Sequence, residues 1–142
     1  MSRKMLIEFP SLDATMTAEL ADSVNPELCD EIWENLPMDA YMEHGVVTGK
    51  IMYCWAPLIS MAPVNKAELH TESPVGRILY SQGTGNKIII NYGFCTEDLG
   101  APVLGLIGTE DLESLKAVGK YVWDAVYCTK ELIPVRFSQK EN

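Results

Sequence analysis

The sequence predicts a mainly β protein, in which about eight short strands form a closed or strongly curled barrel and two α-helices cap its ends. The segment Gly76–Gly93 gives the first reason, because it contains two strands, Arg77–Ser81 and Lys87–Tyr92, around a turn rich in Gly and Asn. The run Ile88–Ile90 does not alternate with polar residues, which indicates a strand buried on both faces. Most strands lie between the two expected helices, so the order is not a βαβ series, and a barrel fits it best.

The other strands are predicted from short apolar and β-branched runs that are bounded by Gly, Pro or polar turns. In chain order they are Met5–Phe9, Ala14–Leu20, Tyr41–Val47, Ile51–Trp55, Val64–Leu69, Val103–Gly108 and Leu132–Phe137. The first two are expected to form a hairpin around the turn Pro10–Asp13. The last residues, Ser138–Asn142, form a polar tail that we expect to fray.

The first helix is expected to begin at Asn25 and Pro26, with Asn25 as the N-cap, and to end before Pro37. Its apolar stripe consists of Leu28, Ile32, Trp33 and Leu36. Thr109 is expected to cap the second helix. Its buried stripe consists of Leu112, Leu115, Val118, Val122 and Val126. Gly119 weakens this helix by about 1 kcal/mol relative to Ala, so the helix can break there.

Length and charge limit the classes of partner. Residues 1–142 suit a single domain with a sizeable core, and the formal net charge is −9. Such a chain repels phosphate backbones and anionic lipid surfaces, so we expect neither a nucleic-acid partner nor a membrane partner. The acidity leaves an anionic small substrate open, because the local field of a pocket can oppose the global charge.

The cysteines favour a reducing compartment, because they stand alone and form no C-x-x-C pair. They are Cys29, Cys54, Cys95 and Cys128. The apolar run near the N-terminus is interrupted by Glu8 and Pro10, which makes it too short for a signal peptide. No apolar run approaches the length of a membrane span. We therefore expect a cytoplasmic protein.

Two glycine-containing segments fail as phosphate-binding motifs. Gly83-Thr84-Gly85 is followed by a strand, whereas the dinucleotide fingerprint requires a helix at that point. Gly45–Lys50 is one residue too short for a P-loop, and Ile51 stands where a Ser or Thr would bind Mg²⁺. Both segments are interpreted as turns between strands.

His44 and His70 are the histidines of the chain, and they lack the i, i+4 spacing of a helical zinc site. We expect neither a metal ion nor a cofactor. His44 lies in a predicted strand and is the candidate general acid/base, and a hydrogen-bonded structural histidine is the alternative. The aromatic residues on predicted strands either pack in the core or line a small-molecule pocket. They are Tyr53, Trp55, Tyr80 and Tyr92.

Five short segments carry a resemblance to a known family. They are His44–Lys50, Pro63–Asn65, Pro74–Tyr80, Ile88–Gly93 and Leu106–Gly108. In their order and spacing they resemble segments of small cyclophilin-like proteins of bacteria, and the resemblance covers the chain from about Met5 to Phe137. The opine-forming enzyme cucumopine synthase has the same fold. The resemblance therefore implies a cyclophilin-like barrel.

The chain departs from the true cyclophilins at the residues of the isomerase. Cyclophilins have a Phe-His-Arg sequence on the strand that corresponds to Ile51–Trp55, and this strand contains no Arg. The later Trp-Leu-Asp-Gly-Lys-His sequence is absent as well. The resemblance thus implies a small-molecule enzyme rather than a prolyl isomerase, with acid/base condensation, cyclisation or ring chemistry on an amino-acid-derived or keto-acid metabolite.

The resulting hypothesis places Trp55, Tyr80 and Tyr92 in the wall of a substrate pocket. His44 is the acid/base in this pocket, and Asn65 orients the substrate by a hydrogen bond. A non-catalytic module that binds a metabolite or peptide is one alternative, and a peptidyl-prolyl cis-trans isomerase is another. Methionine-rich strands and an apolar barrel edge make a homo-oligomer plausible.

Overall fold

The computed structural model describes residues 2–82 and 85–141. The strands of this part of the chain are β1 Lys4–Phe9, β2 Ala14–Leu20, β3 Met38–Tyr41, β4 Glu43–His44, β5 Gly49–Trp55, β6 Ala67–Leu69, β7 Arg77–Ser81, β8 Lys87–Cys95, β9 Gly100–Ile107 and β10 Pro134–Gln139. The helices are α1 Pro26–Glu34 and α2 Leu112–Asp124, and the π-helical turn Ala125–Thr129 extends α2. Neither α-helix of the described chain is long and apolar enough to cross a membrane.

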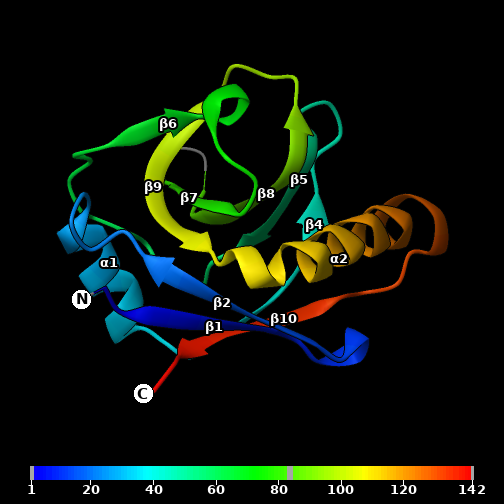
Figure 1. Cartoon of the computed structure of the whole chain (residues 1–142), viewed down its shortest axis with the longest axis horizontal. Helices are drawn as coiled ribbons and strands as arrows, with labels where there is room; N and C mark the ends of the chain where they lie inside the picture. The colour runs from blue at the N-terminus through cyan, green and yellow to red at the C-terminus, as the bar shows by residue number, and fades with distance from the viewer. Residues whose placement is uncertain (1, 83–84, 142) are drawn as a thin grey trace.

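The strands form one strongly curled antiparallel sheet with the order β3-β10-β1-β2-β9-β7-β8-β5-β4, and β6 pairs with β9 outside this order. Figure 1 shows β1, β2 and β10 on one side, and β9, β7, β8 and β5 curling around the other. The two ends of the order, β3 and β4, follow each other in the chain, so the barrel is nearly closed. The predicted mainly β barrel with two helices is therefore confirmed.

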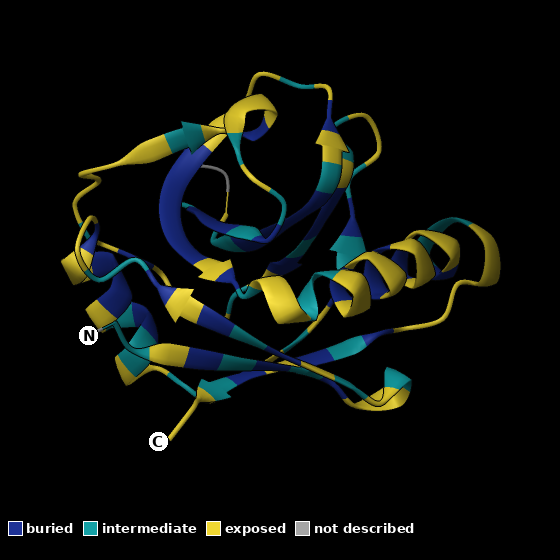
Figure 2. Ribbon diagram, viewed as in Figure 1, coloured by how far each residue is buried: buried dark blue, intermediate teal, exposed yellow. Residues whose placement is uncertain are grey.

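The core fills the inside of this curl, where Figure 2 shows most of the buried residues. In the hairpin of β1 and β2, Ile7 lies opposite Met16, and on the other side of β1 it lies opposite Phe137 of β10. The predicted two-sided burial of β8 is also confirmed. Ile88 and Ile90 belong to the main core, whereas Ile89 packs in a second, smaller cluster.

The strand predicted over Tyr41–Val47 is wrong, and the chain instead forms β3 and β4, which pair with different neighbours. β3 pairs with β10, and β4 pairs with β5. Between them, the backbone N–H of Met42 donates to the carbonyl of Ile133 at 2.8 Å. Val46 and Val47 are exposed in the turn that follows β4. The described chain has ten strands, compared with the predicted number of about eight, and this split accounts for one of the additional strands.

Three further predictions need correction. The side chain of Asn25 does not cap α1 and is fully buried. The predicted fraying of the tail is wrong up to Gln139, because Ser138 and Gln139 pair with β1. α2 continues through Gly119 without a break. The expected turn Gly83-Thr84-Gly85 lies largely outside the described residues.

Candidate active site

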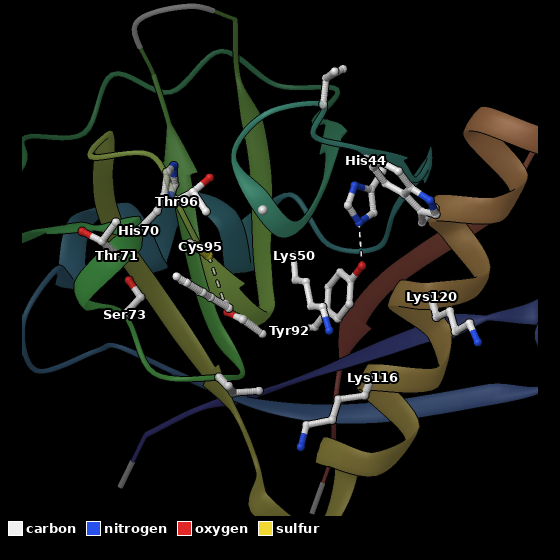
Figure 3. Close-up of a pocket in the computed structure, with 16 residues that line it drawn as sticks. His44, Lys50, His70, Thr71, Ser73, Tyr92, Cys95, Thr96, Lys116 and Lys120 are labelled. Carbon is white, nitrogen blue, oxygen red and sulfur yellow. Dashed lines mark hydrogen bonds between the residues drawn. The ribbon is translucent and has the colours of Figure 1, made fainter.

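A cleft of about 1400 Å³ lies between β4, β5 and β8, the segment 70–75 and α2. Pockets for small molecules typically have volumes of roughly 300–1,000 Å³, so this cleft has room for more than one reactant. The lining residues used below are His44, Lys50, Tyr92, Lys116, Lys120 and Trp123. Figure 3 shows these side chains, which come from elements far apart in the sequence.

The centre of the cleft wall is a hydrogen bond between His44 and Tyr92, with 2.7 Å between Nε2 and the hydroxyl oxygen (Figure 3). The other ring nitrogen, Nδ1, lies 2.8 Å from the carbonyl oxygen of Gly45. A carbonyl only accepts hydrogen bonds, so the hydrogen-bond pattern assigns the proton of the neutral ring to Nδ1. Nε2 then accepts the bond that the Tyr92 hydroxyl donates.

Aromatic rings hold the imidazole of His44 in place. The ring of Trp123 meets it edge to face at 4.9 Å between centroids, and the ring of Tyr127 lies 6.5 Å away. The Tyr127 hydroxyl also donates to the backbone carbonyl of His44 at 3.1 Å. Trp123 lies near the end of α2, and Tyr127 lies in the π-helical turn that extends it. The fold thus fixes the position of His44 from both β8 and α2.

Both members of the pair are uncharged at neutral pH. Burial lowers the pKa of His44 below its ordinary value, and the bond to the Gly45 carbonyl opposes this effect. Burial also raises the pKa of Tyr92, and the negative charge of Asp124 adds to the rise. A neutral imidazole that accepts a proton from a neutral tyrosine is a suitable arrangement for general acid/base chemistry.

The Tyr92 ring packs directly against α2 at Gly119, which has no side chain. A Cβ atom at position 119 would lie 2.5 Å from Cδ2 of Tyr92, closer than side chains pack. Alanine normally stabilises a helix interior by about 1 kcal/mol over glycine. Here we expect Gly119→Ala to destabilise the fold by about 1–3 kcal/mol, because the ring must move. Urea denaturation measures this change.

Ser114→Ala is the matched control, because Ser114 lies on the exposed side of the same helix. We expect it to change the free energy of unfolding by less than about 0.5 kcal/mol. A Gly119→Ala variant that is as stable as the natural protein would show that the Tyr92 ring is not confined there.

We expect the folded protein to lose stability as the pH falls below about 6.5. Burial lowers the pKa of both His44 and His70 from the ordinary value of 6.5. The unfolded chain therefore takes up protons at a higher pH than the folded chain. The free energy of unfolding is then unaffected well above pH 6.5, decreases as the pH falls through 6.5, and levels off once the folded imidazoles are protonated.

Urea denaturation between about pH 7.5 and pH 5.5 tests this expectation. The His44→Gln variant should lose less stability than the natural protein over this range, because one titrating group is gone. An equal loss in the two proteins would mean that protonation of His44 does not destabilise the fold.

The structure brings together only two of the predicted site residues, His44 and Tyr92. Trp55 and Tyr80 lie near the other end of β8, where Trp55 is opposite Lys87 and Tyr80 is opposite Ile88. Tyr92 is four residues beyond Ile88, or roughly 13 Å along the strand. The predicted pocket that combined these aromatic side chains is therefore not formed.

The three remaining predicted residues make other contacts. Trp55 is half exposed, and the ammonium group of Lys87 lies 4.9 Å from the centre of its ring. Tyr80 is fully buried and donates from its hydroxyl to Oδ1 of Asn86 at 3.1 Å. Asn65 is exposed, and its backbone N–H donates to Asn25. None of the three lines the cleft.

Sequence reasoning missed the contributions of α2, which are Trp123, Lys116 and Lys120. The two lysines have i, i+4 spacing and so share one face of the helix, a signal that was available in the sequence. What the sequence does not show is that this face borders β8. Among the described residues, no three His, Cys, Asp or Glu side chains gather in a way that could hold a metal ion.

Comparison with known proteins identifies solved structures that have the same fold as this chain. No family model matches the chain, and no curated protein matches its sequence significantly. The chain is similar to McbB, whose structure is known in complex with tryptophan, with 31% sequence identity and a TM-score of 0.89 over 97% of this chain. It covers only 45% of McbB, so it spans less than half the length of that protein.

A second similar structure is the solution structure of the hypothetical protein AF2241 from Archaeoglobus fulgidus. It shares 16% identity and a TM-score of 0.64, over 98% of this chain and 95% of AF2241. At this identity the similarity shows the fold alone. Together the two structures establish the fold relationship.

Proposed function

We propose that this protein is an enzyme that binds an amino-acid-derived or keto-acid metabolite in the cleft and transfers protons through Tyr92 and His44. The observation that carries the proposal is the 2.7 Å hydrogen bond between these two side chains in the wall of a cleft. The similarity to McbB, with its bound tryptophan, supports a ligand of this size and class. The fold analogy with cucumopine synthase supports condensation or cyclisation as the reaction.

Tyr92 is the member of the pair that meets the ligand in this proposal. Both ring nitrogens of His44 are already engaged, one by Gly45 and one by Tyr92. The Tyr92 oxygen takes a proton from the ligand while its own proton moves to Nε2 of His44. The same path in reverse returns the proton to the product. Because burial disfavours the imidazolium form, His44 holds the proton only briefly.

The competing function is a binding module without catalysis. The observation that favours it is burial, since His44 is 3% exposed and Tyr92 is 6% exposed. A pair this well buried also suits a structural hydrogen bond. The two functions predict the same ligands and differ only in whether a bound ligand is converted.

A thermal-shift screen followed by an assay for products tests the proposal. A ligand that binds only the folded state raises the unfolding midpoint. We expect amino acids such as tryptophan, keto acids or cyclic amides to do so, and a mixture of an amino acid and a keto acid to yield a condensed product by mass spectrometry. Binding without a product would favour the binding module. No shift with any of these compounds would contradict both functions.

A further inference from the structure

Three lysines line one side of the cleft: Lys50 from β5, and Lys116 and Lys120 from α2. They stand out because the chain has only 11 Lys and Arg residues and a net charge of −9. None of the three forms an ion pair or a side-chain hydrogen bond with any described residue. Among the described residues, no Asp or Glu lines the cleft. The local charge of the cleft is thus opposite to that of the whole chain.

The three lysines come from the two elements that border Tyr92, which are β5 and α2. Lys116 and Lys120 lie one turn apart on α2, the helix whose Gly119 touches the Tyr92 ring. Lys50 extends across β8 beside Tyr92, because Gly93 leaves space for it: a Cβ atom there would lie 2.6 Å from Cδ of Lys50. Figure 3 shows the amino group of Lys50 beside the Tyr92 ring and that of Lys116 farther along the cleft, whereas the amino group of Lys120 points away from Tyr92.

Another part of the cleft wall is apolar. Val46 and Phe94 line the cleft and are 71% and 66% exposed, and Trp123 lies nearby against His44. Large apolar side chains exposed together at a cleft commonly mark a surface that contacts a ligand. The cleft therefore offers an apolar surface and a cationic surface to one ligand.

The carboxylates near the cleft do not form a site for an ammonium group. Asp124 acts on Tyr92 and Glu97 acts on His70 through their charges, but neither residue lines the cleft. A ligand ammonium group would face three cations without a carboxylate on the wall. Charges of the same sign at this range repel one another.

We propose that the cleft binds a ligand that has an apolar ring and an acidic group more tightly than the same ligand with an added free ammonium group. The ring lies on Val46, Phe94 and Trp123, and the acidic group, a carboxylate or a phosphate monoester, lies among the lysines. This inference rests on the proposed function, because it takes the cleft as the ligand site. It ranks ring-bearing acids such as aromatic keto acids above amino acids as ligands of the cleft.

Four indole compounds with different charged groups test this selection: indole-3-propionate, L-tryptophan and tryptamine, which share a two-carbon chain, and indoxyl phosphate, whose phosphate is esterified directly to the ring. Calorimetric titration at low salt measures each affinity. We expect indole-3-propionate to bind about fivefold more tightly than tryptophan, and tryptamine to bind most weakly. Indoxyl phosphate separates the two acid chemistries, since tighter binding than the propionate identifies a phosphate site and weaker binding a carboxylate site.

The double variant Lys116→Gln with Lys120→Gln is expected to bind indole-3-propionate about tenfold more weakly. Lys4→Gln removes one positive charge outside the cleft lining and should leave the affinity unchanged. The inference is overturned if indole-3-propionate does not bind at millimolar concentration, if tryptophan or tryptamine binds as tightly, or if the double variant binds the propionate normally. These titrations do not measure turnover, so such a failure is distinct from a failure of the chemistry proposed for His44 and Tyr92.

Discussion

Replacing Asn25 by alanine is expected to destabilise the folded protein by about 3–4 kcal/mol, the largest stability effect that the structure suggests for one polar side chain. Asn25 is fully buried. Its Nδ2 donates to the carbonyls of Lys66 and Val103, at 2.9 and 2.7 Å. Its Oδ1 accepts from the backbone N–H groups of Asn65 and Lys66, both at 3.0 Å.

The effect is large because alanine leaves backbone groups without hydrogen-bond partners. The amide joins the start of α1 to the segment before β6 and to β9. Without it, several backbone groups in a largely buried place lose their partners, and each such group costs about 1–3 kcal/mol unless water reaches it. Urea denaturation measures the loss. A thermal scan should show a midpoint about 10 °C lower, at roughly 3 °C per kcal/mol.

Asn35→Ala is the matched control for this variant. Asn35 lies at the other end of α1, and its Nδ2 donates to the carbonyl of Glu31 at 2.8 Å in an exposed position. Water can replace this bond, so we expect a loss below about 1 kcal/mol. If Asn25→Ala costs no more than Asn35→Ala, the buried bonds of Asn25 contribute little to stability.

Asn25 also shows where local sequence patterns reach their limit. An Asn before a Pro-initiated helix is typical of an N-cap, and α1 does begin there. An Asn amide can satisfy its own helix or a distant segment, and here it bonds to Val103, 78 residues away. The pattern therefore predicts the helix correctly and the side chain wrongly. Nothing near residue 25 indicates which partner is available.

The strands show the same difference between what the local sequence predicts and what distant partners decide. The two-sided burial of β8 could be predicted, because Ile88–Ile90 is apolar without alternation. The split of the segment after α1 could not, because nothing in the sequence around Met42 marks a break between two strands. Its role depends on Ile133, whose carbonyl it meets only once the barrel has nearly closed. Strand composition indicates which residues extend, whereas the pairing partners decide where each strand stops.

The candidate site was predictable in its chemistry and not in its geometry. His44 and Tyr92 were both expected in a site, but the bond between them joins residues 48 positions apart. Tyr80 was expected beside them because it has the same residue type and lies on the neighbouring strand. The register of β7 and β8 places it opposite Ile88 instead. Residue type alone does not show which end of a barrel strand borders a cleft.

Tyr92→Phe is expected to lower turnover about 10²–10⁴-fold, the usual contribution of a positioned acid/base group, and to leave ligand affinity nearly unchanged. The variant removes one oxygen atom and keeps the ring that packs against Gly119 and His44. A ligand proton then has no path to Nε2 of His44. The expected signature is a fall in kcat with an unaltered dissociation constant, measured by product formation and by titration.

Tyr121→Phe provides the matched control on α2. The Tyr121 hydroxyl donates to Glu131 at 2.9 Å, and the residue is exposed. Its loss should change neither turnover nor affinity by more than about twofold, since exposed polar contacts contribute little.

Tyr127→Phe tests a different point, because that hydroxyl holds the backbone of His44 and touches no reacting group in the proposed path. We expect it to lower turnover less than Tyr92→Phe does.

The comparison of Tyr92→Phe with His44→Gln decides between proton transfer by the pair and a structural hydrogen bond. If the two side chains act in series, removing either one blocks the same path, so the double variant should be no slower than the worse single variant. If the bond only supports the fold, both variants lose stability and retain normal turnover per folded molecule. A Tyr92→Phe variant with normal kcat would therefore remove the acid/base role from both residues, and would leave the cleft as a binding site alone.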